Sequence, residues 1–535
     1  METRFQEREA RIYYERGFWR ANDLWADFVA RVAEVPDKTA VVCGQYSATF
    51  DELRRAASSV AVRLERSGIL PGDVVGLYGR HSVEALVALL GCINLGAVVA
   101  PVPPIFGDQQ VDLLLSQCSA KALITFGERG QKGQFGLGDM QVPVVIELGV
   151  GGFAELVAEG GGRQHQPVDA DAPAVILLSS GTTSVPKGVV HSTNTLRYAS
   201  EQVLARWGLR GDDCMLVVVE FGFVGALVFG YLPALLSGAT AVLLPRWEVN
   251  EACRLVEAHR CSYVLLMPTH GADFLYYEDR DTFDLSSLRV LVAAGMSHER
   301  RVALYEATGL PPLGDYGLSE VPGNCAPAPE APLEKILTTE GLPFDGTEIR
   351  ICEGDARVEP GVDGEVVVNG PSRFLGFLGN DTLTRDSIAE WGGYRTGDVG
   401  RIDPDGYFTY VGREKDIIRR GGVTIVPSEV EIVLIRHPAV REVAIVGFDD
   451  GRLGERGCAA IILQPRAEAP SLQEVQAFLA EAGVAKYAWP EAVEIFNEFP
   501  RTPSLKAVKR DIRAEVARRR NSSGTQAQER EAQPK

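Results

Sequence analysis

Short apolar runs alternate with helical stretches along most of this chain, and this rhythm constrains the fold more than any other feature. TAVVCG at 39–44 precedes a helical pattern at 50–68, and DVVGLYG at 73–79 precedes a second one at 81–95. The rhythm recurs as far as SYVLLMP at 262–268. Strands that alternate with helices form parallel sheets covered by helices on both faces. The sequence therefore predicts an α/β protein whose large N-terminal body contains two doubly wound sheets.

The pattern changes to strands alone between about residues 346 and 412. Pro404-Asp405-Gly406 separates two of these strands and is a hairpin turn signal. A smaller unit of strands and helices follows the charged run REKDIIRR. A chain of 535 residues is too long for one core. We therefore predict an N-terminal domain at 1–412 with a small β subdomain, a smaller mobile α+β domain at 413–520, and a disordered polar tail at 521–535.

Charge and cysteine content narrow the classes of function. The chain has 54 lysine and arginine residues against 72 acidic ones, a net charge of −18, which disfavours nucleic acid as a partner. Its nine cysteines are dispersed without a C-x-x-C pair, as in cytosolic proteins with reduced thiols. The uncharged stretch at 221–245 is interrupted by Pro233 and predicts a buried helix and strand. The N-terminus lacks an apolar signal core, so we expect a cytoplasmic protein without a membrane span.

A loop rich in hydroxyl groups follows the apolar run AVILL. It reads SSGTTSVPKG and occupies residues 179–188. Hydroxyl groups and glycine amides after a strand form a nest for phosphate oxygens, and Lys187 adds a positive charge. The loop is not a Walker A loop, because Lys187 is followed by glycine rather than serine or threonine. The residues indicate a phosphate site, with a loop that binds no ligand as the alternative.

Four further segments join this loop in an order that covers nearly the whole chain. They are Tyr316-Gly317-Leu318-Ser319-Glu320, Tyr394-Arg395-Thr396-Gly397-Asp398, the junction at 412–431, and Pro500 to Lys506. Together the five segments resemble the adenylate-forming enzymes: acyl- and aryl-CoA ligases, luciferases and the adenylation domains of peptide synthetases. Two residues depart from the family pattern, Ser184 and Leu505, because the family usually has glycine at both positions. The resemblance implies an AMP-forming acid–thiol ligase that uses ATP, Mg²⁺ and CoA.

The resemblance also implies roles for single residues. Asp398 with Arg413 would bind the ribose hydroxyls, and Tyr316 would lie against the adenine. The residues implied for the nucleotide and CoA are Ser179, Ser180, Gly181, Thr182, Thr183, Lys187, Ala294, Gly295, Met296, Asp315, Tyr316, Gly317, Ser319, Asp398, Arg413, Gly421 and Gly422.

The catalytic residues implied by the resemblance are Lys506, Glu320 and Lys187. A carboxylate must attack the α-phosphate, so two anions meet and positive charge has to be held there. Lys506 would supply that charge, and Glu320 would coordinate Mg²⁺, a hard cation that prefers carboxylate oxygen. Lys506 lies in a basic stretch, for which a solvated helix face is the default explanation.

A second half-reaction follows from the same resemblance. In the CoA ligases of the family, the small domain rotates after the adenylate has formed. Lys415 occupies the hinge position, and Gly422 the point where the pantetheine arm passes close to the backbone. Glycine suits that passage because it has no Cβ. CoA, a carrier-protein thiol and no thiol at all remain open as acceptors.

The acid would meet the segment around Gly222. The substrate-binding residues implied there are Phe221, Gly222, Phe223, Val224 and Gly225. Gly222 offers no counter-charge to an ammonium group, which argues against amino acids because a buried unpaired charge is costly. A glycine also leaves volume, so we predict a bulky cyclic or aromatic hydrophobic acid. The alternative is that Gly222 only permits close packing.

Two other functions stay open at this point. One is an adenylating enzyme that stops at acyl-AMP or loads a carrier protein. The other is a catalytically silent nucleotide-binding homologue, to which Ser184 and Leu505 lend slight support. The intact set of Glu320, Asp398 and Lys506 argues against silence. The sequence leaves the oligomeric state open, a homodimer included.

Overall fold

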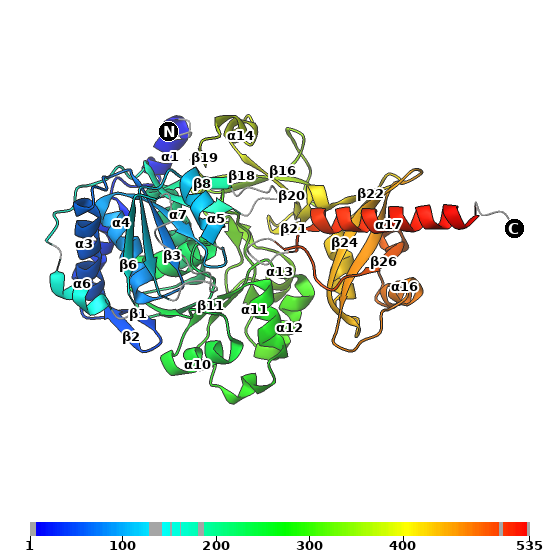
Figure 1. Cartoon of the computed structure of the whole chain (residues 1–535), viewed down its shortest axis with the longest axis horizontal. Helices are drawn as coiled ribbons and strands as arrows, with labels where there is room; N and C mark the ends of the chain where they lie inside the picture. Colours follow the sequence, from blue (N-terminus) through cyan, green and yellow to red (C-terminus); the bar gives the residue numbers. More distant parts are fainter. Residues whose placement is uncertain are drawn as a thin grey trace.

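The computed structural model describes residues 7–106, 108–127, 142–149, 152–160, 162–179, 187–501 and 507–531. Within these residues the larger part of the chain forms a body with two seven-stranded sheets and a smaller five-stranded one. The C-terminal part forms a separate, smaller unit beside that body (Figure 1). The predicted α/β body with a smaller C-terminal domain is therefore confirmed.

The first seven-stranded sheet, sheet I, is parallel except at one edge. Its strand order is β13 (Pro312–Leu313), β12 (Val290–Ala293), β11 (Tyr263–Leu266), β9 (Cys214–Val217), β10 (Thr240–Leu243), β1 (Thr39–Cys43) and β2 (Tyr46–Thr49). Only β1 and β2 pair antiparallel, because a tight turn joins them directly. Helices α10 (Val249–His259), α11 (Pro268–Tyr276) and α12 (His298–Thr308) contact this sheet.

The second sheet, sheet II, carries the loop with the hydroxyl groups at its antiparallel side. Its order is β19 (Gly376–Phe377), β8 (Lys187–Ser192), β7 (Pro173–Ser179), β4 (Val98–Val102), β3 (Val74–Gly79), β5 (Ala122–Phe126) and β6 (Val144–Leu148). β8 pairs antiparallel with both β7 and β19. The loop therefore joins the two strands of a hairpin, whereas the alternation of strands and helices predicts parallel neighbours.

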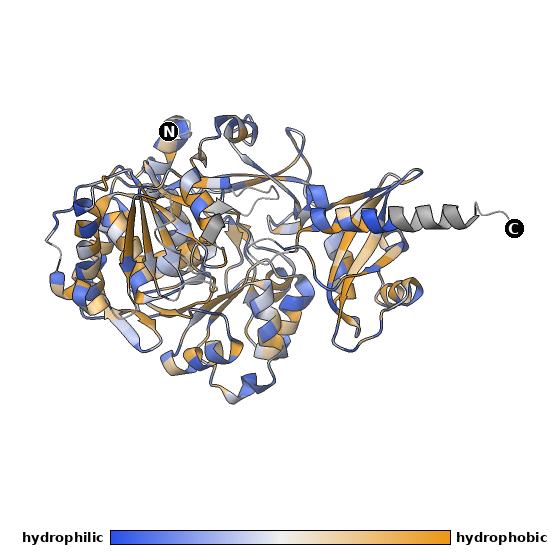
Figure 2. Cartoon of the chain, viewed as in Figure 1, coloured by the Kyte–Doolittle hydropathy of each residue, from blue (hydrophilic) through white to orange (hydrophobic). Residues whose placement is uncertain are grey.

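The main core lies between the two sheets. Helix α4 (Val83–Leu95) contacts β3 and β4 of sheet II as well as β1 and β2 of sheet I. It begins where the Ser82 hydroxyl accepts a hydrogen bond from the Ala85 amide, and it ends at Gly96 with φ of 81°. Apart from the buried Glu84 and Asn94, its sequence is apolar on all sides, as expected for a helix buried between two layers. Figure 2 shows hydrophobic strands in the interior of the body and, on its outside, helices that carry both hydrophobic and hydrophilic residues.

The other helices of the body surround this core. They are α2 (Leu24–Glu34), α3 (Phe50–Arg66), α5 (Asp108–Gln117), α6 (Phe153–Glu159), α7 (Thr193–Trp207), α13 (Leu333–Thr338) and α14 (Asp381–Asp386). The uncharged stretch after residue 221 forms α8 (Val224–Ala226), a π-helical turn at Leu227–Tyr231, α9 (Leu232–Ser237) and strand β10. The predicted buried helix and strand are therefore confirmed. Of the helices in the described residues, none is long and apolar enough to cross a membrane.

The small β subdomain is an antiparallel sheet in the order β17 (Ala356–Arg357), β16 (Glu348–Glu353), β18 (Gly364–Asn369), β20 (Tyr394–Ile402) and β21 (Phe408–Arg413). The Gly406 amide bonds the Asp403 carbonyl and closes the predicted turn between β20 and β21. This hairpin places Asp398 directly opposite Arg413. Two short strands, β14 (Cys325–Ala326) and β15 (Leu342–Pro343), form a separate pair.

The C-terminal unit has its own sheet in the order β23 (Val423–Ile425), β22 (Ile418–Arg420), β25 (Gly454–Leu463) and β24 (Val440–Asp450), with β26 (Ala492–Ile495) beside β25. Helices α15 (Pro427–Leu434), α16 (Leu472–Glu481) and α17 (Lys509–Glu531) complete it. Helix α17 extends over the first residues of the predicted tail, to Glu531, and the disorder of 521–535 stays a prediction.

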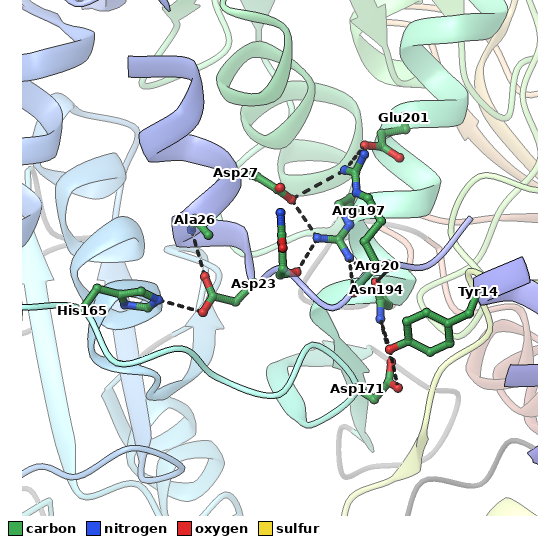
Figure 3. Close-up of polar contacts among 11 residues, drawn as sticks. Tyr14, Arg20, Asp23, Ala26, Asp27, His165, Asp171, Asn194, Arg197 and Glu201 are labelled. Atoms are coloured by element: carbon green, nitrogen blue, oxygen red, sulfur yellow. Dashed lines mark hydrogen bonds and ion pairs between the residues drawn. The ribbon is translucent and has the colours of Figure 1, made fainter. Parts of the chain in front are cut away.

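An N-terminal segment with α1 (Glu7–Glu15) is fastened to α7 by polar contacts (Figure 3). The Tyr14 hydroxyl donates to Asp171 Oδ2 at 2.8 Å, and the Asn194 amide donates to Asp171 Oδ1 at 2.7 Å. Arg197, fully buried on α7, pairs with Asp27 on α2 at 2.7 Å. Since α7 follows β8 without a break, these contacts hold the hairpin that carries the hydroxyl-rich loop.

Candidate active site

Asp398 is the centre of a buried polar cluster at the edge of the β subdomain. Its side chain is almost fully buried, and its Oδ1 lies 2.9 Å from Arg413 Nε across the β20–β21 register. The Tyr316 hydroxyl donates a hydrogen bond to Asp398 Oδ2 at 2.8 Å. A carboxylate offers about four acceptor positions, so both oxygens can still accept hydroxyl groups of a ligand.

Tyr316 belongs to a loop that folds back on itself. The Tyr316 amide bonds the Cys325 carbonyl at 3.1 Å, and Gly317 lies so close to Gly323 that a Cβ would sit 2.7 Å from its amide nitrogen. The ring of Tyr316 stacks on Tyr410 and packs against Phe408, with centroids 6.1 and 4.7 Å away. Burial and the neighbouring Asp398 raise the pKa of Tyr316 well above its usual value, so the phenol stays a donor.

Glu320 ends the same loop and faces two cationic side chains. Burial raises the pKa of its carboxyl, while Arg413, a hydrogen bond from Tyr394 and Lys187 act to lower it. The carbonyl of Glu320 accepts a hydrogen bond from the Phe374 amide at 2.8 Å. The loop, β20, β21 and the start of β8 therefore converge on one carboxylate.

Two side chains in this cluster received no role from the sequence. Tyr394 binds the carboxyl of Glu320, and His191 on β8 contacts the Ser319 carbonyl through Nε2 at 2.7 Å and the Thr195 hydroxyl through Nδ1 at 3.0 Å. Burial lowers the pKa of His191 to about 4, so the ring is neutral at physiological pH. Both residues lie inside recurring motifs, but only the fold shows that they hold the Tyr316–Glu320 loop.

Lys187 begins β8, opposite Ser179 on β7. Its Nζ lies 5.2 Å from the centre of the Phe377 ring, and its charge acts on Glu320. Ser179 and Lys187 therefore flank the hydroxyl-rich loop. Ser180, Gly181, Thr182, Thr183 and Ser184 lie outside the described residues, as do Leu505 and Lys506.

The segment expected beside the adenine follows β12. The Ala294 amide bonds the Leu266 carbonyl at 3.0 Å, and Gly295 has a φ of 61°. The Met296 side chain is buried against Gly271 of α11, so only its backbone can face a ligand. Asp315 belongs to a different neighbourhood: burial and nearby Glu340 raise its pKa to about 7, with Arg301 acting in the opposite direction.

Gly421 and Gly422 form the two-residue turn between β22 and β23. Their φ values of 57° and 84° are those of a type I′ hairpin turn, which requires a positive φ at both central residues. A Cβ on Gly422 would have nothing within 4 Å. The positive φ values therefore explain why glycine occupies both positions, and Gly422 also has open space beside it.

The segment expected at the acid lies between the two large sheets, and Gly222 leaves no volume there. Gly222 has a φ of 97°, and a Cβ would lie 2.6 Å from the backbone nitrogen of Pro103. The expectation of a wide space at this residue is therefore wrong, because the Pro103 backbone fills it. Phe221 is buried edge-to-face against Phe126, whereas Phe223 and Val224 are half-buried, and Gly225 lies against Val219.

Replacing Gly222 with alanine is expected to lower the free energy of unfolding by about 2–5 kcal/mol. The positive φ costs about 1–2 kcal/mol in an L-residue, and the contact with Pro103 adds an overpacking cost of about 1–3 kcal/mol. Urea denaturation measures the change. Gly225→Ala is the control, because its φ is not positive and its Cβ meets only the Val219 side chain, at 3.1 Å, and no backbone atom. Equal stability of the two variants would contradict the assignment.

The described residues can bind a nucleotide and one hard cation. Asp398 offers acceptors for ribose hydroxyls, Tyr316 offers an aromatic face, and Lys187 with Arg413 balances negative charge. No group of three or more candidate metal ligands occurs among the residues with described positions. Mg²⁺ fits nevertheless, because it commonly takes one or two carboxylates and completes its shell with phosphate oxygens and water.

Two family models match this chain. The model for AMP-binding enzymes covers residues 28–378, and the model for the AMP-binding enzyme C-terminal domain covers residues 429–506. Both predicted parts of the chain are thus represented in the match.

Individual proteins show the same likeness over nearly their full length. The medium-chain fatty-acid–CoA ligase of Escherichia coli (strain K12) is 30% identical over 96% of this chain and 94% of its own. The feruloyl-CoA synthase of an Amycolatopsis species is also 30% identical, over 91% of this chain and 97% of its own. The crystal structure of the anthranilate CoA ligase AuaEII with anthranoyl-AMP superposes with a TM-score of 0.83 at 24% identity, covering 93% of this chain and 98% of that one.

Proposed function

The chain belongs to the AMP-binding enzyme family and is a ligase, and on this basis we propose that it activates a carboxylic acid with ATP to an acyl adenylate and then transfers the acyl group to CoA. The observation that carries the proposal is the cluster of Tyr316, Asp398 and Arg413 beside Glu320. The cluster places one carboxylate that can bind ribose, Asp398, near a second one that can bind a cation, Glu320. A silent homologue would have no need to keep both.

In the first step the acid carboxylate attacks the α-phosphate of ATP and pyrophosphate leaves. Asp398 accepts hydrogen bonds from the ribose hydroxyls, and the ring of Tyr316 lies against the adenine. Lys187 and, from the small domain, Lys506 place positive charge where the two anions meet. Arg413 holds the Asp398 carboxylate and lies near Glu320, so one cation orients both acidic groups.

Glu320 is the residue that would hold Mg²⁺. The ion would neutralise phosphate charge and orient the leaving pyrophosphate. Tyr394 and the backbone bond from Phe374 fix the position of Glu320. His191 supports the same loop from β8 through the Ser319 carbonyl.

Release of pyrophosphate tests the proposal. The full chain is incubated with ATP, Mg²⁺ and a broad panel of carboxylic acids, and pyrophosphate is measured with and without each acid. We expect acid-dependent release that falls at least 100-fold in Lys506→Ala. Release that persists unchanged in that variant, or no release with any acid, would refute the proposed activity.

The identity of the acceptor is decided by the products. Incubation with CoA should convert the adenylate into acyl-CoA and AMP, as mass spectrometry can show. Accumulation of acyl-AMP despite CoA would instead support an enzyme that stops at the adenylate or loads a carrier protein. The Gly421-Gly422 turn, with open space at Gly422, is the feature that favours a thiol arm.

Lys415→Pro is expected to separate the two half-reactions. Lys415 lies in a single 3-10 turn, Glu414–Asp416, between β21 of the body and β22 of the small domain. Proline fixes φ near −65° and would restrict rotation at this joint. We expect acid-dependent pyrophosphate release to stay within about threefold, while thioester formation falls more than tenfold. Equal loss of both steps would show that the joint is no hinge.

A further inference from the structure

A short segment after β9, Val219 to Gly222, touches the carboxyl ends of three strands of sheet II. Next to β3, His81 Nε2 contacts the Val219 carbonyl at 2.8 Å. Beyond β4, the Pro103 backbone lies against Gly222, and at the end of β5 the Phe126 ring meets Phe221 with centroids 5.1 Å apart. In open α/β sheets, ligands bind outside the carboxyl ends of the strands. The two sheets therefore meet where a substrate is expected.

An ion pair crosses between the sheets at this place. Arg80 directly follows β3, and Glu220 follows β9, with Arg80 Nη1 3.5 Å from Glu220 Oε1. Arg80 is 9% exposed, although its side chain carries a full charge. Burial raises the pKa of Glu220, and the charges of Arg80 and Arg246 act to lower it. Arg80 is thus withdrawn from solvent between the two sheets, whereas the Glu220 side chain keeps 28% of its surface exposed.

Each partner has one buried polar atom that the pair does not satisfy. Arg80 Nε and Glu220 Oε2 have no hydrogen-bond partner within the described part of the chain. A buried donor and a buried acceptor that stay unpaired destabilise a protein by several kcal/mol. A ligand group that accepts from Arg80 and donates to Glu220 would remove that penalty.

A hydroxyl group does both through a single oxygen atom. The rings of Phe126 and Phe221 provide the apolar surroundings that suit the carbon skeleton of such a ligand. We propose that Arg80 and Glu220 bind a hydroxyl group of the acid substrate, at a distance from its reacting carboxylate. This inference rests on the proposed acid activation and narrows its substrate class to hydroxylated acids with a hydrophobic skeleton.

Matched pairs of acids test the proposal. Pyrophosphate release by the full chain is measured with cinnamic acid and its three monohydroxy isomers, with benzoic acid and its hydroxy isomers, and with cyclohexanecarboxylic acid and its 4-hydroxy derivative. We expect the best acid of the panel to carry a hydroxyl group and to exceed its unsubstituted analogue at least tenfold in kcat/KM. A site built around a hydroxyl group rejects the analogue that lacks it, because its polar atoms then stay unpaired.

Two variants test whether Arg80 and Glu220 cause the preference for hydroxylated acids. Arg80→Met/Glu220→Leu removes both charges together, so that neither is left buried without its partner, and it should bring the ratio of hydroxylated to unsubstituted acid close to one. Glu220→Gln keeps the shape of the side chain but not its charge, and the ratio should fall severalfold. The control Arg63→Met/Glu159→Leu removes an exposed ion pair of the same body and should keep the ratio of the unaltered enzyme.

The possible failures are distinguishable. A ratio near one for every pair with the unaltered enzyme, or a ratio that both variants preserve, would overturn the role of Arg80 and Glu220 while leaving acid activation intact. No pyrophosphate release with any acid, hydroxylated or not, would instead contradict the proposed function itself.

Discussion

Glu320→Gln is expected to lower kcat/KM for pyrophosphate release by about 10²–10³-fold, the range seen when one electrostatic contact to the reacting group is removed. Glutamine keeps the shape of the side chain but not the charge that a hard cation requires. The bond from Tyr394 can still form with the amide oxygen, so the fold should be retained. The measurement is steady-state pyrophosphate release over a range of Mg²⁺ concentrations.

The Mg²⁺ dependence separates a ligand from a structural residue. If Glu320 binds the cation, the variant should need a higher Mg²⁺ concentration for half-maximal rate. Glu365→Gln is the matched control, because Glu365 lies on β18 of the same subdomain and pairs with Arg395. That variant should keep both the rate and the Mg²⁺ dependence. A loss of rate in Glu320→Gln without any change in the Mg²⁺ dependence would argue against the cation role.

Asp398→Asn is expected to raise the KM for ATP by about 10–100-fold. The carboxylate holds two donors at once, the Tyr316 hydroxyl at 2.8 Å and Arg413 Nε at 2.9 Å. An amide turns an NH₂ group toward one of them and loses the charge that attracts ribose hydroxyls in the proposed site. Hydrogen bonds to charged groups contribute about 1.5–3 kcal/mol. We also expect a loss of about 1–3 kcal/mol in stability, since Arg413 loses its partner but remains partly exposed.

Asp403→Asn controls for the loss of an ion pair in the same hairpin. Asp403 lies in the β20–β21 turn and binds Lys335, away from the Tyr316 cluster. The control should lower thermal stability without changing the KM for ATP. If both variants changed the KM equally, the effect of Asp398 would be one of sheet stability and not of nucleotide binding.

Much of the body could be predicted because its signals are local. The apolar runs at 39–44 and 73–79 correspond to β1 and β3, and the helical pattern at 50–68 corresponds to α3. The turn signal at Pro404-Asp405-Gly406 is a turn in the structure. The polar composition of the tail predicts disorder, and α17 is the element that borders it, with its end at Glu531.

The site was only partly predictable. Tyr316, Glu320 and Asp398 stand in recognisable motifs, but the motifs do not state which atoms meet. The hydrogen bond between Tyr316 and Asp398 joins residues 82 positions apart, and the contact between His191 and Ser319 joins residues 128 apart. At Gly222 the prediction from the sequence failed. The missing side chain suggested free volume, but the backbone of Pro103, far away in the sequence, fills that space.

The sequence by itself determined the class of fold, the membership in a ligase family and the residue types that nucleotide chemistry needs, because these depend on local periodicity and on short motifs. The tertiary structure alone decided that β7 and β8 form a hairpin, that Arg413 lies opposite Asp398, and that Arg80 and Glu220 face each other between two sheets. The physical reason is that strand register, backbone approach and the burial of charge are set by chain segments far apart in sequence, which no local pattern records.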